Sequence, residues 1–119
     1  MLEIIFYRRK NGEVPVLDYL RRLKDESTKD SRIRKDKALQ YIDILRQKGT
    51  RVGEPIVKHL DGKIWELRPS KDRILFAGIV GAKFVLLHVF QKKTQKTPLR
   101  EIDQAKRELM DYLERSNEE

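Results

Sequence analysis

Residues 63–98 read KIWELRPSKDRILFAGIVGAKFVLLHVFQKKTQKTP, and this stretch decides the fold. It holds three runs rich in β-branched and aromatic residues, which are typical of strands: 63–68, 73–80 and 83–90. Pro69, Ser70, Lys71 and Asp72 predict a hairpin loop between the first two runs. Gly81-Ala82 predicts a tight turn between the last two. The stretch therefore predicts an antiparallel meander of three strands.

The patterns on either side of the meander predict helices. Apolar residues at helical spacing indicate three of them, at residues 14–26, 31–48 and 97–115, the last with Thr97 as its N-cap. Residues 2–7 form an apolar run that predicts a buried strand. The resulting order, β-α-α-β-β-β-α, indicates an α+β fold. We expect one domain over residues 1–119, a small antiparallel sheet packed by an N-terminal helical hairpin and a C-terminal helix.

Charge indicates a polyanionic partner. The 119 residues include 27 Lys and Arg against 19 Asp and Glu, a net charge of +8. Residues 100–119 hold seven acids and four bases, a charge of −3. Because the whole chain carries +8, residues 1–99 carry +11. Such a basic body favours nucleic acid before membrane, although a solvated lysine-rich surface would have the same composition.

The residue inventory excludes several kinds of site. The chain has no cysteine, so it has no disulfide, thiolate metal site or cysteine nucleophile. Its two histidines lack the spacing of zinc ligands, and we expect no metal and no cofactor. The apolar stretch near residue 2 is shorter than a signal peptide or a spanning helix requires, which predicts a cytoplasmic protein.

Two arginines predict a phosphate site at one end of the meander. Arg68 ends the first strand and Arg73 begins the second, so the short loop between them should place them near one another. Two like charges across a hairpin need an anion or an acid between them, and Glu66 lies on the same strand face as Arg68. A surface salt bridge would explain that pair without any function. The planar guanidinium fork nevertheless suits phosphate oxygens.

The segment after the third strand adds further donors. Residues 91–97 read QKKTQKT and supply Lys92, Lys93 and Lys96 just before the last helix, a favourable environment for phosphate. In the predicted meander the first strand runs toward Arg68 and the third toward Phe90. Arg68, Arg73 and residues 90–93 should therefore meet at one end of the sheet, with Lys71 of the hairpin loop as a further RNA contact.

A basic site without metal ligands suits transesterification of RNA by its own 2′-OH, since cations stabilise the phosphorane. The reaction also needs a base and an acid. A lysine crowded by cations releases its proton more readily, so Lys93 is the first candidate and Glu66 the alternative base. His88 is the one imidazole nearby, but its apolar strand favours a structural role. Phe90 is a candidate for stacking on a base, whereas Trp65 alternates with Leu67 as a core residue does.

The predicted helical hairpin is also strongly basic. Between residues 21 and 37 its bases are Arg21, Arg22, Lys24, Lys29, Arg32, Arg34, Lys35 and Lys37. They form either a solvated face or a secondary surface for RNA or a partner protein.

Several of these residues form a pattern that resembles a known family. The motifs are WELR at residues 65–68, Arg73, LHVFQKKTQKTP at residues 87–98 and EIDQA at residues 101–105. In this order and at these distances they resemble the phage Gp49-like branch of the HigB toxins, within the wider RelE/ParE superfamily. The resemblance extends from Ile4 to about Leu113, and the predicted element order fits the family fold.

The resemblance implies a ribosome-dependent mRNA interferase, which cuts mRNA in the ribosomal A site. It also implies a HigA-like helix-turn-helix antitoxin as partner, in a toxin–antitoxin heterotetramer. Carried over to this chain, the catalytic or RNA-positioning roles fall on Arg68, Arg73 and Lys93, supported by Lys92 and Lys96. The tyrosine or histidine that several superfamily members use near the C-terminus has no counterpart after Phe90, which leaves the proton donor open. The alternatives are a ParE-like toxin acting on a protein and a non-catalytic nucleic-acid-binding module.

Overall fold

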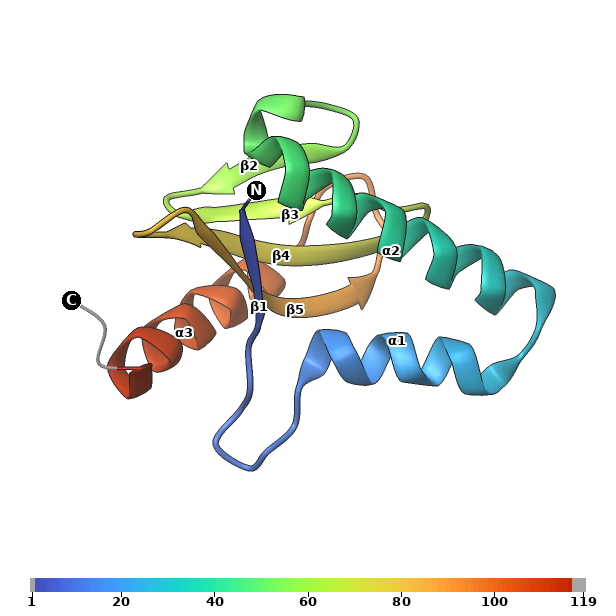
Figure 1. Cartoon of the computed structure of the whole chain (residues 1–119), viewed down its shortest axis with the longest axis horizontal. Coiled ribbons are helices and arrows are strands. Elements are labelled where there is room, and N and C mark those ends of the chain that lie inside the picture. The colour runs from blue at the N-terminus through green and yellow to red at the C-terminus, as the bar shows by residue number, and fades with distance from the viewer. Residues whose placement is uncertain (1, 117–119) are drawn as a thin grey trace.

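The structure is a computed structural model that describes residues 2–116 (Figure 1). Along the chain its elements are β1 (Glu3–Phe6), α1 (Pro15–Glu26), α2 (Lys29–Lys48), the 3-10 helix η1 (Gly49–Val52), β2 (Val57–Asp61), β3 (Ile64–Leu67), β4 (Asp72–Ile79), β5 (Lys83–Gln91) and α3 (Leu99–Ser116). None of the helices in this part of the chain is long and apolar enough to cross a membrane.

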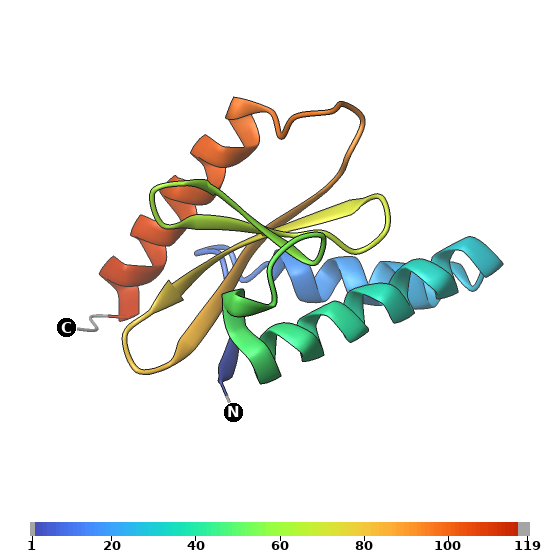
Figure 2. The same ribbon diagram turned by 90° about the horizontal axis from the view of Figure 1, so that it is seen from above.

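The five strands form one sheet in the order β1-β5-β4-β3-β2, with helices on both faces. Figure 2 shows α3 on one face and the α1–α2 hairpin on the other. Alternation along the strands separates two cores. Leu67, Ile74 and Phe76 pack beneath α1 and α2. Ile64 and Leu75 are among the residues that pack beneath α3.

The α+β class is confirmed, but the sheet differs from the prediction in two respects. β2 is an additional strand that was not predicted, because Lys58 and Asp61 interrupt its apolar pattern. The Asp61-Gly62 dipeptide, which is typical of a hairpin turn, is the sequence signal for it. β1 is not a buried strand but the edge of the sheet, and it pairs with β5 in parallel. The sheet is therefore mixed rather than wholly antiparallel.

Two helix starts also differ. α2 begins at Lys29 because Thr28 and Ser31 form a capping box, in which each side chain accepts from the other's backbone N–H. α3 begins at Leu99, so Pro98 and not Thr97 precedes the helix. The Thr97 hydroxyl instead donates a hydrogen bond to Glu66 of β3.

A register shift in β5 decides which side chains reach the α3 face. Phe76 pairs with Leu86 and Leu75 pairs with His88, so Leu87 has no partner of its own on β4. Such a bulge changes the faces to which the following side chains point. As a result His88 lies on the α3 face, although strict alternation from Leu86 would place it beneath the helical hairpin.

Candidate nucleic-acid interface

The candidate interface is built around Glu66, which is only 2% exposed. Its Oε2 atom lies 3.5 Å from Arg68 Nε and 3.9 Å from Arg73 Nε. The Thr97 hydroxyl donates to its Oε1 atom. One buried carboxylate therefore faces two guanidinium groups and also holds the loop that leads into α3. We call Glu66, Arg68, Arg73 and Thr97 the arginine cluster.

Arg73 is the more buried of the two arginines, with a side chain 8% exposed. Its Nη1 atom donates to the carbonyl oxygens of Ser70 at 3.0 Å and Asp72 at 2.8 Å, which ties it to the β3–β4 loop. Burial lowers the pKa of Arg73 from its ordinary value, but a guanidinium stays protonated in proteins. The side chain is thus a fixed positive charge beneath the surface.

Arg68 is the more accessible arginine, with a side chain 21% exposed. Its Nη1 atom lies 3.6 Å from the exposed carboxylate of Glu54. The Nε atoms of Arg68 and of Arg73 are buried and have no hydrogen-bond acceptor among the residues described. Glu66 therefore holds both groups by charge rather than by well-aligned hydrogen bonds.

A buried network fixes the loop that carries Arg73. Asp72 is 1% exposed and accepts from Tyr19 of α1 at 2.6 Å. Arg34 of α2 donates to both oxygens of the same carboxylate at 3.0 Å. Burial raises the pKa of Tyr19, with the hydrogen bond to Asp72 acting in the same direction. The sequence pattern missed this network, and the prediction that Arg34 belongs to an outward basic face was wrong.

The predicted convergence at one end of the sheet is confirmed. Arg73 pairs with Phe90 in the β4–β5 register, and the backbone N–H of Lys92 donates to the Lys71 carbonyl at 2.8 Å. Lys93 is exposed and lines a cavity of about 290 Å³ together with Phe90. Lys71 and Lys96 are exposed on the two neighbouring loops, where no described contact joins the Lys96 side chain to the arginines.

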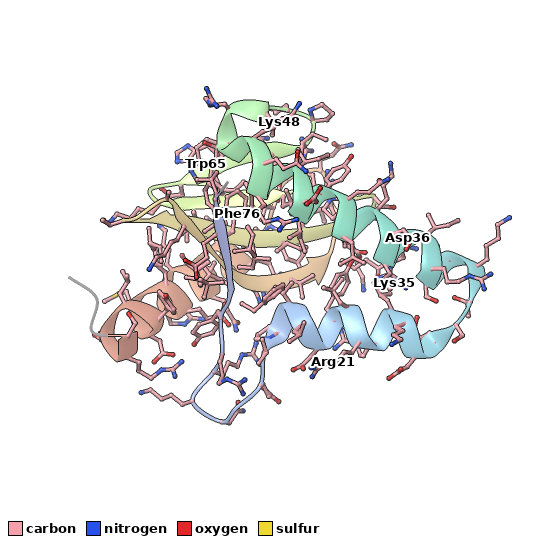
Figure 3. All side chains as sticks on the ribbon, viewed as in Figure 1. Arg21, Lys35, Asp36, Lys48, Trp65 and Phe76 are labelled. Carbon is pink, nitrogen blue, oxygen red and sulfur yellow. The ribbon has the colours of Figure 1, made fainter. Side chains whose placement is uncertain are left out.

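The aromatic and imidazole candidates occupy different faces. His88 is mostly buried on the α3 face, and its Nε2 atom lies 2.5 Å from Oε1 of Glu101. The Phe90 ring stacks on His88 with 6.1 Å between ring centroids. Trp65 is partly buried against the core beneath the helices, beside its register partner Phe76 (Figure 3). The expected core role of Trp65 is thus confirmed.

The arrangement is suited to holding an anion. Two guanidiniums share one buried carboxylate, so positive charge is left facing the lysines of the exit loop. Within residues 2–116 no three His, Asp or Glu side chains are grouped so as to hold a metal ion.

A second cavity, of about 490 Å³, lies between the β1–α1 turn and α3. Glu108 lines it and is buried, and its Oε1 atom has no hydrogen-bond donor among the described residues. Its Oε2 atom lies 3.5 Å from Arg9. Burial raises the pKa of the Glu108 carboxyl above its ordinary value.

Residues 18–110, which are most of the chain, match the family model described as Phage derived protein Gp49-like (DUF891). The chain belongs to this Gp49-like family. The family is part of the toxin-like RelE/HigB-type group and is associated with the toxins of toxin–antitoxin systems. No match to a curated protein was found. For this Gp49-like chain, the match includes all of the arginine cluster and the exit loop.

Proposed function

We propose that this protein is a metal-independent endoribonuclease, the mRNA-cutting toxin of a toxin–antitoxin pair. The observation that carries the proposal is the arginine cluster, in which Arg68 and Arg73 share a single buried carboxylate beside a lysine-rich loop. A site with excess positive charge and an arginine side chain that is 21% exposed suits an RNA phosphate. The family's association with toxins supports an activity directed against the host cell.

In the proposed reaction the RNA supplies its own nucleophile. The 2′-oxygen attacks the adjacent phosphorus and the bond from phosphorus to the 5′-oxygen breaks, which leaves a 2′,3′-cyclic phosphate and a 5′-hydroxyl. Arg68, the accessible arginine, donates to a non-bridging oxygen of the phosphorane, and Arg73 adds its charge from beneath. Removing one such donor commonly lowers the rate by ~10²–10³, by analogy with oxyanion-hole deletions.

Two protons must move in this reaction. The first candidate for these transfers is Lys93, which is exposed and lines the cavity with Phe90. The second candidate is His88. Glu66 is buried, flanked by two arginines and already engaged by Thr97, so in this proposal it positions the cations. Lys92, Lys96 and Lys71 guide the RNA backbone toward the cluster.

The proposed target is mRNA in the ribosomal A site, and the proposed partner is a HigA-like helix-turn-helix antitoxin in a heterotetramer. Both follow from the RelE/HigB-type group to which the family belongs. The proposal of ribosome entry is supported in one respect, since the basic end of the sheet and the exposed bases between residues 21 and 37 offer phosphate-binding charge on two sides.

The test is to add purified protein to a translating extract and map mRNA ends by primer extension. We expect new 5′ ends within codons, downstream fragments that begin with a 5′-hydroxyl, and upstream fragments whose 3′ ends carry a 2′,3′-cyclic phosphate rather than a 3′-hydroxyl. Arg68→Ala and Lys93→Ala should abolish most cutting while the far-ultraviolet circular dichroism stays unchanged.

Lys48→Ala is the matched control. Lys48 is exposed at the far end of α2, about 21 Å along the helix from Arg34 at 1.5 Å per residue (Figure 3). This variant should cut like the wild type. Intact mRNA with wild-type protein refutes the nuclease; RNA binding without cutting would favour a nucleic-acid-binding module, and products with 3′-hydroxyl ends would refute 2′-OH attack.

A further inference from the structure

The cavity of about 290 Å³ beside the arginine cluster is built by three segments of the chain. They are the end of β5, the exit loop and the first turn of α3, and the loop arches away from α3 before returning to it (Figure 2). Its lining residues are Phe90, Gln91, Lys93, Thr94, Pro98, Arg100 and Glu101. Ligand sites start at about 300 Å³, so this volume suits a single small group such as one nucleobase.

Two of its walls are held in place by a third residue outside the cavity. His88 contacts Oε1 of Glu101 at 2.5 Å and stacks on the Phe90 ring at an angle of 29°. The ring and the carboxylate are therefore fixed relative to one another before any ligand binds. A ring beside a hydrogen-bonding edge is how proteins bind unstacked RNA bases.

The cavity also has a defined position relative to the arginine cluster. Phe90 is the register partner of Arg73, so the cavity lies one strand away from the proposed phosphate contacts. A nucleotide whose phosphate lies at Arg68 can place its own or its neighbour's base there.

The polar groups of the cavity select among the bases. Glu101 is an acceptor, and its carboxylate has about four lone-pair sites, of which His88 uses one. Guanine presents two donors on one edge, N1–H and the N2 amino group, whereas adenine presents a bare N1 lone pair on that edge. Arg100 lies with Nε 3.7 Å from Glu101 Oε2 and has a side chain 81% exposed. It is free to turn toward guanine O6 and N7, the commonest arginine–base contact.

We propose that this cavity binds a guanine base next to the cleaved phosphodiester, with Phe90 stacking on it, Glu101 accepting from its N1 and N2 donors, and Arg100 donating to O6 or N7. The inference rests on the proposed endoribonuclease function. It makes the cavity the source of base preference, while the arginine cluster acts on any phosphate.

A binding experiment tests the site without any cleavage. Guanosine 3′-monophosphate and adenosine 3′-monophosphate are titrated separately into ¹⁵N-labelled protein and followed by NMR. We expect guanosine 3′-monophosphate to bind about tenfold more tightly, within the discrimination of a bidentate base contact, and to shift the amide signals of Phe90 and Glu101. Glu101→Gln and Arg100→Ala should each reduce the ratio of affinities toward one. Asp103→Asn, which removes an exposed acid from the solvent side of α3, should leave it unchanged.

A cleavage experiment tests the position of the base. Cut sites in a translating extract are counted by the base that flanks them. For each protein the number of sites flanked by guanine is divided by the number flanked by adenine, so that differences in overall activity cancel. We expect guanine to be enriched for the wild type and the ratio to fall in Arg100→Ala, whose exposed side chain can be removed without disturbing the fold. Cutting with no base preference, together with equal affinities for the two nucleotides, overturns the guanine site and leaves the nuclease proposal standing. Guanosine selectivity without any cutting supports the base site and refutes the nuclease.

Discussion

Replacing Asp72 by asparagine should destabilise the protein strongly although the side-chain shape is kept. The amide can still accept from Tyr19, but it no longer balances Arg34, whose side chain is 17% exposed and donates to both carboxylate oxygens. Removing one partner of a buried ion pair costs about 3–5 kcal/mol. Because Arg34 also lies 3.6 Å from Asp30, we expect the lower end, about 3 kcal/mol.

The assay is urea unfolding of Asp72→Asn and wild type, followed by circular dichroism. With a slope of about 1.5 kcal/mol per molar urea, a loss of 3 kcal/mol lowers the midpoint by about 2 M. The melting temperature should fall by about 10 °C for a domain of this size. The matched control is Asp30→Asn, which removes a 64% exposed acid that contacts the same Arg34 and should cost less than about 1 kcal/mol.

A double-mutant cycle separates the unpaired charge from a loss of packing. If the unbalanced guanidinium causes the loss, Arg34→Met should restore part of the stability of Asp72→Asn, with a coupling energy of about 1–3 kcal/mol. The reasoning is refuted if Asp72→Asn alone unfolds within about 0.5 kcal/mol of the wild type, which is the range of an ordinary surface change.

Three further outcomes follow from the structure. Glu66→Gln should lower the free energy of unfolding, measured by thermal unfolding, by about 3 kcal/mol, because Arg68 and Arg73 lose their shared buried acid. The control Glu54→Gln removes an exposed acid and should lower it by less than about 1 kcal/mol. Equal losses would contradict the central place of Glu66. Burial raises the pKa of Glu108, so just above pH 4.5 the folded state binds more protons than the unfolded state, and the stability of the wild type should fall as pH rises. Glu108→Gln should be more stable than the wild type at pH 7 and should lack this fall. Parallel curves of urea midpoint against pH for the two proteins would contradict the prediction. RNA affinity measured by fluorescence anisotropy should fall steeply with sodium chloride, and Lys92→Ala should lower the log–log slope by about one while Lys48→Ala leaves it unchanged; a flat wild-type response would remove the electrostatic argument.

Local patterns in the sequence were enough to predict most of the elements. The two-residue alternation of β3 and β4, together with the four-residue loop, placed Arg68 beside Arg73 and Glu66 on their face. These are short-range properties of the chain, since strand periodicity and hairpin length act between near neighbours. β2 was not predicted because its charged residues hide the alternation, although Asp61-Gly62 is typical of the turn that follows it.

Partners that lie far apart in the chain were beyond such patterns. Tyr19 and Arg34 meet Asp72 across separations of 53 and 38 residues. Arg34 is one of eight bases between residues 21 and 37, and no local feature marks it as the inward one. Its role follows only from how the α1–α2 hairpin packs on the sheet.

The sequence by itself determined the α+β class, the order of every strand and α-helix except β2, the excess positive charge, and the meeting of Arg68, Arg73 and the exit loop at one end of the sheet. Only the tertiary structure decided where His88 and Phe90 point. Strict alternation from Leu86 would direct both beneath the helical hairpin, away from the arginine cluster. The bulge at Leu87 directs them to the α3 face, where His88 meets Glu101. The physical reason is that strand register is set by pairing with β4 and packing against α3, and neither partner is visible in the local sequence of β5.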